Sequence, residues 1–151
     1  MHPGGVAILP ILPDGRIVFV RQQRYPMEEY LIELPAGRVE PAEEPIVTAR
    51  RELMEETGYR AEELVPMLKF YPTPGYVNEE IHIFKATGLT PGATDFDDGE
   101  EIETLLLEPS QALSKVFSGE IRDGKTIIGI LWYHQQSVHY NQSVDNKRGI
   151  F

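Results

Sequence analysis

The sequence contains no cysteine, which excludes a disulfide framework, a zinc site built on thiolates and a cysteine nucleophile. Basic residues are scarce: 14 lysines and arginines stand against 24 aspartates and glutamates, for a formal net charge of -10. This balance argues against a nucleic-acid-binding protein, which needs a basic face. No apolar run approaches the ~18 residues of a membrane span, and no basic-then-apolar leader opens the chain. From these absences we expect a cytoplasmic protein that binds neither membranes nor nucleic acids.

The sequence is instead rich in clustered acidic residues. Its length of 151 residues predicts one domain, which we expect to span residues 1–136, with a polar, patternless tail over 137–151. The acidic residues gather at 28–33, 40–56, 79–80 and 95–103. A disordered acidic tail would form one solvated block, so clusters that alternate with structured segments favour a metal site.

Alternating apolar residues and turn signals predict several strands. Residues 5–12 and 16–22 are predicted to form a hairpin around the turn Pro13-Asp14-Gly15. Ala36 and Gly37 are expected to form a tight loop. The remaining strands are predicted at 30–34, 65–71, 80–86 and 102–107.

Helical spacing and capping residues predict three helices. The first covers residues 43–57 and ends at Gly58, a residue suited to a helix C-cap. Ser110 and Asp123 are expected to cap two later helices. The apolar face of the first helix is predicted to consist of Ile46, Ala49, Leu53 and Thr57. This mixture indicates an α/β (α+β) sandwich with a mixed β-sheet.

Three glutamates on the first predicted helix carry the clearest chemical signal. At about 100° per residue, Glu52, Glu55 and Glu56 share one arc of the helix. Like charges at this spacing destabilise a helix by a few tenths of a kcal/mol each, so they need open water or a cation. A solvated acidic face is the alternative, but the preceding glycine loop and Arg51 favour a site for Mg²⁺ or Mn²⁺.

The segment around this helix resembles the signature of the Nudix hydrolase family. The matching residues are Gly37, then Glu43 after five residues, then after seven more the run Arg51-Glu52-Leu53-Met54-Glu55-Glu56-Thr57-Gly58. Tyr59 departs from the pattern by placing an aromatic residue in the last apolar slot. The resemblance covers residues 4 to 135, and it implies an α/β/α sandwich around a mixed sheet.

The same resemblance implies roles for individual residues. It identifies Glu52, Glu55, Glu56 and the carbonyl of Ala36 as metal ligands, for two or three Mg²⁺ or Mn²⁺ ions, with Glu52 and Glu56 catalytic. It also implies that Gly37, Glu43 and Arg51 support the site, the latter two as an internal ion pair. Such enzymes hydrolyse a nucleoside diphosphate linked to another group, with metal-activated water as the nucleophile.

Segments outside the signature resemble the ADP-ribose pyrophosphatase subfamily. Pro74 lies sixteen residues after Gly58 and matches the proline marker of this subfamily, and residues 20–25 and 33–37 are similar to it as well. The match implies that Pro74 supports the site. The substrate-binding residues implied in this way are Arg24, Glu79, Gly75 and Tyr76. A plain turn at Pro74 and Gly75 is the alternative.

A second acidic cluster, Asp97-Asp98-Gly99-Glu100-Glu101, lies late in the chain. The resemblance implies a mobile loop that supplies a catalytic carboxylate and a late metal ligand. Glu100 is the favoured residue for both roles, and Asp98, one methylene shorter than the usual glutamate, is the second catalytic candidate. An exposed acidic loop is the alternative.

We therefore expect a Nudix pyrophosphatase that splits ADP-ribose into AMP and ribose 5-phosphate. The rivals are hydrolysis of another sugar nucleotide, a dinucleotide or a nucleoside triphosphate, and a Nudix-shaped binding module without turnover. Proteins of this subfamily carry an N-terminal region that supports a homodimer and the adenosine pocket. Here His2-Pro3-Gly4 stands at the start, so that region is expected to be absent and the dimer is an open question.

Overall fold

The computed structural model describes residues 4–25, 29–92 and 103–148. Seven strands and three helices are found in these ranges. The strands are β1 (Gly5–Pro10), β2 (Ile17–Arg24), β3 (Glu29–Glu33), β4 (Ala36–Arg38), β5 (Tyr59–Phe70), β6 (Ile81–Pro91) and β7 (Glu103–Leu107). The helices are α1 (Pro45–Thr57), α2 (Pro109–Phe117) and α3 (Gly124–Arg148).

The strands form two sheets. One has the order β4-β1-β6-β5, and the other has the order β3-β2-β7. β1 runs parallel to β6, whereas the other pairs are antiparallel. The first sheet is therefore mixed, as the sequence predicts, and it brings β1 next to both β4 and β6.

The predicted hairpin of residues 5–12 and 16–22 was wrong. The turn forms, since the Leu12 N–H donates to the Arg16 carbonyl at 2.8 Å. Beyond a single bridge between Ile11 and Ile17, however, β1 and β2 separate into different sheets. The physical reason is burial: all six residues of β1 are buried, so β1 needs strand neighbours along both edges.

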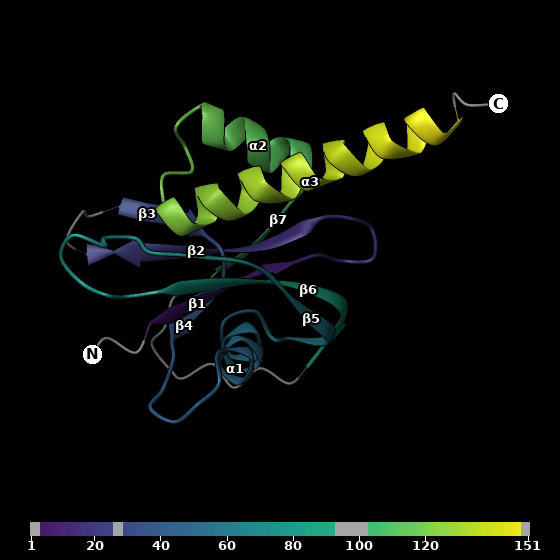
Figure 1. Cartoon of the computed structure of the whole chain (residues 1–151). Coiled ribbons are helices and arrows are strands. Elements are labelled where there is room, and N and C mark those ends of the chain that lie inside the picture. The colour runs from purple at the N-terminus through teal and green to yellow at the C-terminus, as the bar shows by residue number, and fades with distance from the viewer. Residues whose placement is uncertain (1–3, 26–28, 93–102, 149–151) are drawn as a thin grey trace.

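The helices cover the sheets from two sides, with α1 on one side and α2 and α3 on the other (Figure 1). Two groups of buried side chains match these layers. One, which includes Leu34, Ile83 and Ile130, lies toward α2 and α3. The other, which includes Val6 and Leu53, lies toward α1. The expected α/β/α arrangement around a mixed sheet is confirmed.

Helix α1 has clear physical boundaries. Pro45 occupies its first turn, where a missing N–H costs nothing. Gly58 ends it in the left-handed conformation, with φ of 77°, and its N–H donates to the Met54 carbonyl at 2.9 Å. Of the predicted apolar face, Ile46 is 39% exposed, and the buried residues are Thr48, Ala49, Leu53 and Thr57.

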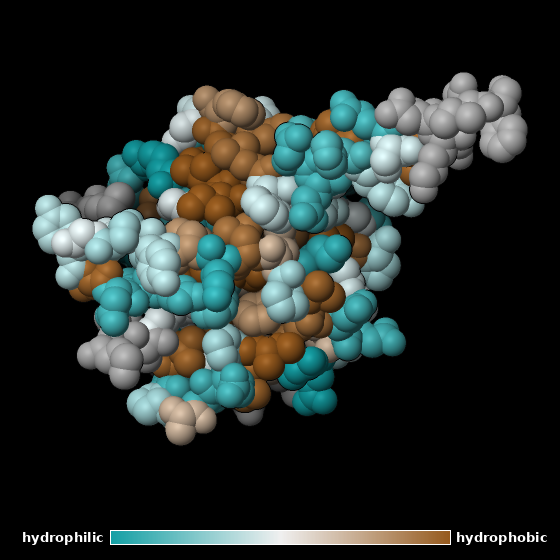
Figure 2. All heavy atoms as spheres, in the orientation of Figure 1, coloured by the Kyte–Doolittle hydropathy of each residue, from teal (hydrophilic) through white to brown (hydrophobic). Residues whose placement is uncertain are grey.

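Several local predictions need correction. Ala36 and Gly37 belong to β4, because they pair with β1. The residue that caps α2 is Glu108, whose side chain forms a capping box with Gln111. Residues 137–148, expected to be a patternless tail, continue α3. In Figure 2 the coloured part of this projecting segment is mostly hydrophilic, which explains why no apolar periodicity reveals it. None of the helices in the described ranges is long and apolar enough to cross a membrane.

Candidate active site

Helix α1 carries the three predicted glutamates into different surroundings. The side chain of Glu52 is 14% exposed, whereas that of Glu55 is 56% exposed. Glu56 is also partly buried. The helix therefore presents two enclosed carboxylates and one that faces solvent.

Glu56 is held against the start of β4. The N–H of Ala36 donates to its Oε2 at 3.1 Å. Burial, together with the negative charges of Glu52 and Glu33, raises the pKa of Glu56 to about 8. The Ala36 N–H and the Lys125 ammonium oppose this rise without cancelling it. Without a bound cation, Glu56 therefore carries a proton at neutral pH.

Glu52 packs directly on the backbone of Gly37. A Cβ atom at residue 37 would lie 2.2 Å from the Glu52 Cδ and 2.4 Å from its Oε1. This close approach is the steric reason for a glycine in the sequence. Burial and the nearby Glu55 charge raise the pKa of Glu52, while Arg51 opposes the shift.

Arg51 joins the loop before α1 to the helix. Its guanidinium donates to Glu43 at 2.9 Å and to Glu52 at 3.0 Å, and it lies 3.6 Å from the Glu55 carboxylate. Hydrogen bonds from Arg51 and from the Thr48 hydroxyl hold the pKa of Glu43 below its usual range. The expected ion pair of Arg51 and Glu43 is present, and their supporting role stays a prediction.

The donors at this site suit a hard divalent cation. Carboxylate and carbonyl oxygens are the ligands that Mg²⁺ and Mn²⁺ prefer, and the pKa values of Glu52 and Glu56 stay raised although Arg51 and Lys125 oppose the rise. The glutamates do not converge as a ready cluster, however: within residues 4–25, 29–92 and 103–148 no three acidic or histidine side chains form a metal-binding group. Glu52 and Glu55 face Arg51, whereas Glu56 faces Ala36.

A buried ion network lies behind Ala36. Glu33 is 2% exposed and accepts two hydrogen bonds from Arg24, at 2.8 and 2.9 Å. It also accepts one from the Lys125 ammonium at 2.9 Å, which in turn donates to both oxygens of Asp123 at 2.9 Å. Burial opposes the charge on Lys125, but the carboxylates of Asp123 and Glu33 outweigh it and raise its pKa.

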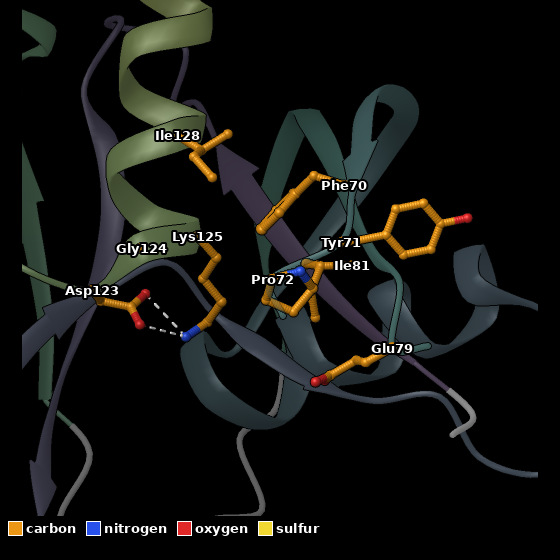
Figure 3. Close-up of a pocket in the computed structure, with 9 residues that line it drawn as sticks. All are labelled: Phe70, Tyr71, Pro72, Glu79, Ile81, Asp123, Gly124, Lys125 and Ile128. Carbon is orange, nitrogen blue, oxygen red and sulfur yellow. Dashed lines mark hydrogen bonds and ion pairs between the residues drawn. The ribbon is translucent and has the colours of Figure 1, made fainter. Parts of the chain in front are cut away.

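This network reaches one wall of a pocket of about 430 Å³ (Figure 3). The pocket lies between the start of α3, the end of β5 and the start of β6. Lys125 and Asp123 form its polar side, and Glu79 projects into it from the opposite side. The rest of the wall is mostly apolar and consists of Phe70, Tyr71, Pro72, Ile81 and Ile128, with the backbone of Gly124. A concave, mostly apolar space with few charged groups is typical of a small-molecule site.

The predicted substrate residues, together with the predicted supporting residue Pro74, divide into two groups. Glu79 lines the pocket, and Arg24 joins the network behind it, with its side chain 42% exposed. Pro74, Gly75 and Tyr76 instead lie in an exposed turn, in which the Tyr76 N–H donates to the Thr73 carbonyl at 3.0 Å. Tyr76 is 92% exposed, and the structure brings none of these three residues to the pocket wall.

Two predicted site residues are not described by the structure, and two residues near the site were not predicted. Asp98 and Glu100 fall outside the described residues. Sequence reasoning gave no role to Glu33 or Lys125, although both belong to the buried network. Two signals were available in the sequence. Glu33 is a charged residue inside the apolar run Tyr30–Leu34, and Lys125 follows the predicted helix cap Asp123 by two residues.

Comparison with known proteins identifies the family. A model described as the NUDIX domain matches residues 1–127. The chain belongs to the NUDIX family. It is 41% identical over 131 residues to an ADP-ribose pyrophosphatase of Bacillus subtilis (strain 168), a match that covers 85% of this chain and 71% of that protein. The chain is therefore a Nudix hydrolase, and hydrolases of this family use divalent metal ions.

Two further relatives and one solved structure carry names other than ADP-ribose pyrophosphatase. A methanol dehydrogenase activator of Bacillus methanolicus is 39% identical over 137 residues, covering 89% of this chain and 74% of that protein. A GDP-mannose pyrophosphatase of Salmonella typhimurium is 42% identical over 130 residues, covering 80% and 67%. A solved structure of an ADP compounds hydrolase, 22% identical, superposes with a TM-score of 0.80 over 88% of this chain and 71% of its own. That likeness supports the fold alone.

Proposed function

We propose that this Nudix hydrolase cleaves ADP-ribose into AMP and ribose 5-phosphate. The observation that carries the proposal is the pair of enclosed carboxylates, Glu52 and Glu56, packed against the backbone of Ala36 and Gly37. Carboxylates are expensive to bury, and such groups with perturbed pKa values gather at functional sites. The ADP-ribose pyrophosphatase relative supports the choice of substrate.

Glu52, Glu56 and the Ala36 carbonyl would hold the divalent ion, either Mg²⁺ or Mn²⁺. Glu55 and Glu100 would serve additional ions, for a total of two or three. When bound, such ions neutralise diphosphate charge and lower the pKa of a water molecule. The protein contributes a fixed frame: Gly37 lets Glu52 approach, Arg51 holds the loop before α1 to the helix, and Asp98 or Glu100 would accept the proton of the attacking water.

The pocket beside Lys125 would take the substrate. Its apolar wall offers contact area to a ribose or base, while Glu79 offers an acceptor for hydroxyl groups. Arg24 presents its remaining N–H groups to a phosphate, a geometry in which arginine binds strongly. In this proposal the buried Glu33 fixes the direction of the Arg24 guanidinium.

GDP-mannose is the second candidate substrate. A relative named for that activity is 42% identical, about as similar as the ADP-ribose pyrophosphatase. Both substrates carry a sugar on a nucleoside diphosphate, so the metal site and Arg24 would serve either. A cytoplasmic location stays a prediction of the sequence, which leaves the dimer an open question.

The decisive experiment is product analysis by mass spectrometry with each candidate substrate. ADP-ribose, GDP-mannose, ADP-glucose, NADH and dGTP are incubated separately with Mg²⁺ and with Mn²⁺. The proposal expects AMP and ribose 5-phosphate from ADP-ribose, and their loss in Glu56→Gln. Glu63→Gln, an exposed glutamate on β5, is the matched control and should keep full activity. Turnover of GDP-mannose alone would overturn the choice of substrate, and full activity in Glu56→Gln would overturn the site.

A further inference from the structure

Three consecutive residues that lead into the candidate site are each hydrogen-bonded to a different element. The Leu34 N–H donates to the Thr126 hydroxyl of α3 at 2.9 Å. The Pro35 carbonyl accepts from the Ile8 N–H of β1 at 2.9 Å, and the Ala36 N–H donates to Glu56 of α1 at 3.1 Å. The proline ring fixes φ at the middle residue. A shift of the backbone at Leu34 would therefore be passed on to Ala36.

The anchor on α3 is directional. The Thr126 hydroxyl donates its proton to Asp123 Oδ2 at 2.6 Å. Its lone pairs are therefore left to accept the Leu34 N–H. Thr126 is 0% exposed, so solvent water does not reach this position to replace the hydroxyl as the acceptor of the Leu34 N–H. Asp123 is itself held by two hydrogen bonds from Lys125, which ties the hydroxyl to the ion network at the pocket wall.

The side chain of Leu34 is held by the same helix. A Cβ atom at Gly129 would lie 2.8 Å from the Leu34 Cδ1, so the glycine lets the leucine seat against α3. Leu34 is 1% exposed. Helix α3 thus fixes both the backbone and the side chain of the residue two positions before Ala36.

We propose that Thr126 is a positioning residue for Glu56, which acts by fixing Leu34 and, through Pro35, the Ala36 N–H that holds the Glu56 carboxylate. The inference rests on the proposed function, because it takes Glu56 as essential for hydrolysis. It assigns a role in the site to α3, on the face of the sheets opposite to α1 (Figure 1).

The test compares Thr126→Val with Thr126→Ser. Valine keeps the shape and removes the hydroxyl, whereas serine keeps the hydroxyl. Ser137→Ala is the matched control, because Ser137 lies on the same helix and, among the described residues, its hydroxyl bonds only to the Tyr133 carbonyl of that helix. We expect kcat to fall about tenfold in Thr126→Val with KM within about twofold, since a misplaced group near the chemistry costs this much or more. The serine and control variants should keep kcat within about twofold of the parent.

A second measurement does not depend on activity. Hydrogen exchange is followed in peptides that cover residues 31–38, in EDTA. We expect about tenfold faster exchange at Leu34 and Ala36 in Thr126→Val, with parental rates in Thr126→Ser. Thermal unfolding of each variant shows that it is folded at the assay temperature.

The outcomes separate this inference from the proposed function. If Glu56→Gln is inactive but Thr126→Val keeps the parental kcat, or if serine does not restore it, Thr126 is not a positioning residue. Unchanged exchange at Leu34 and Ala36 in Thr126→Val overturns the inference as well. If Glu56→Gln keeps full turnover, the proposed site fails instead, and the exchange rates alone then decide whether Thr126 holds the segment.

Discussion

Replacing Glu56 by glutamine should stabilise the metal-free protein at alkaline pH while abolishing hydrolysis. Burial and neighbouring carboxylates raise the pKa of Glu56 from an ordinary 4.5 to about 8. Between these two values the folded state keeps a proton that the unfolded state releases. Stability therefore falls as pH rises through this window and levels off above it. A glutamine has nearly the same shape, can still accept the Ala36 N–H and carries no charge to desolvate.

The size of the effect follows from the two pKa values. A difference from 4.5 to about 8 corresponds to at most about 5 kcal/mol when both states are ionised, at about 1.4 kcal/mol per pH unit. Part of this loss is already present at pH 5.5, so the change between pH 5.5 and 8.5 is at most about 3 kcal/mol. Solvent near this partly buried group reduces it further, and we expect about 1–2 kcal/mol.

The assay is urea unfolding in EDTA at pH 5.5, 7.0 and 8.5 for the parent, Glu56→Gln and Glu55→Gln. Glu55 is 56% exposed, so its variant should follow the pH dependence of the parent. Glu56→Gln should show a weaker pH dependence than the parent, since Glu52, whose pKa is also raised, remains, and it should be the more stable protein at pH 8.5. If parent and Glu56→Gln show the same pH dependence, or if Glu56→Gln is the less stable at pH 8.5, the argument from burial is refuted.

Three further predictions concern the same site. Gly37→Ala should lower kcat at least tenfold in a steady-state assay, because the new Cβ would lie 2.2 Å from the Glu52 Cδ; unchanged kcat would contradict the packing. Arg24→Met should lower the free energy of unfolding by about 2 kcal/mol in urea, since Glu33, 2% exposed, loses two of its hydrogen bonds; a change below about 0.5 kcal/mol would show that the pair is unimportant for stability. Mg²⁺ affinity measured by titration calorimetry should rise with pH until about pH 8, because Glu56, with a pKa of about 8, must release its proton to bind a cation; an affinity independent of pH from 6 to 8 would exclude Glu56 as a ligand.

The candidate site was most predictable where its residues are close in sequence. Arg51, Glu52 and Glu56 lie on one helix, and helical geometry alone relates them. The pair of Arg51 with Glu43 and the supporting role of Gly37 were implied by the resemblance to the Nudix signature, not by helical spacing. Here the structure adds what spacing cannot give: Glu52 is enclosed, whereas Glu55 faces solvent.

Contacts between distant segments were not predictable from this one sequence. Glu33 and Lys125 are 92 residues apart, and no local rule relates a strand residue to the first turn of a late helix. The pairing of β1 failed for the same reason: a fully buried strand gives no alternation to indicate its neighbours. The C-terminal half of α3 was missed because its residues are polar on most sides, and such a helix lacks the apolar stripe on which recognition depends.

Burying the carboxylates of the candidate site opposes folding, so other parts of the protein must hold them in place. Glu52 and Glu56 lie on α1, where burial raises both pKa values, and the Ala36 N–H and the Lys125 ammonium oppose the rise at Glu56. The Ala36 N–H can do this only if its segment stays in place. That segment is anchored on the other face of the sheets, by Thr126 of α3. We therefore predict that substitutions in the first turn of α3 affect hydrolysis more than substitutions of equal burial elsewhere in the core, because α3 holds the backbone on which the proposed catalytic carboxylate of Glu56 depends.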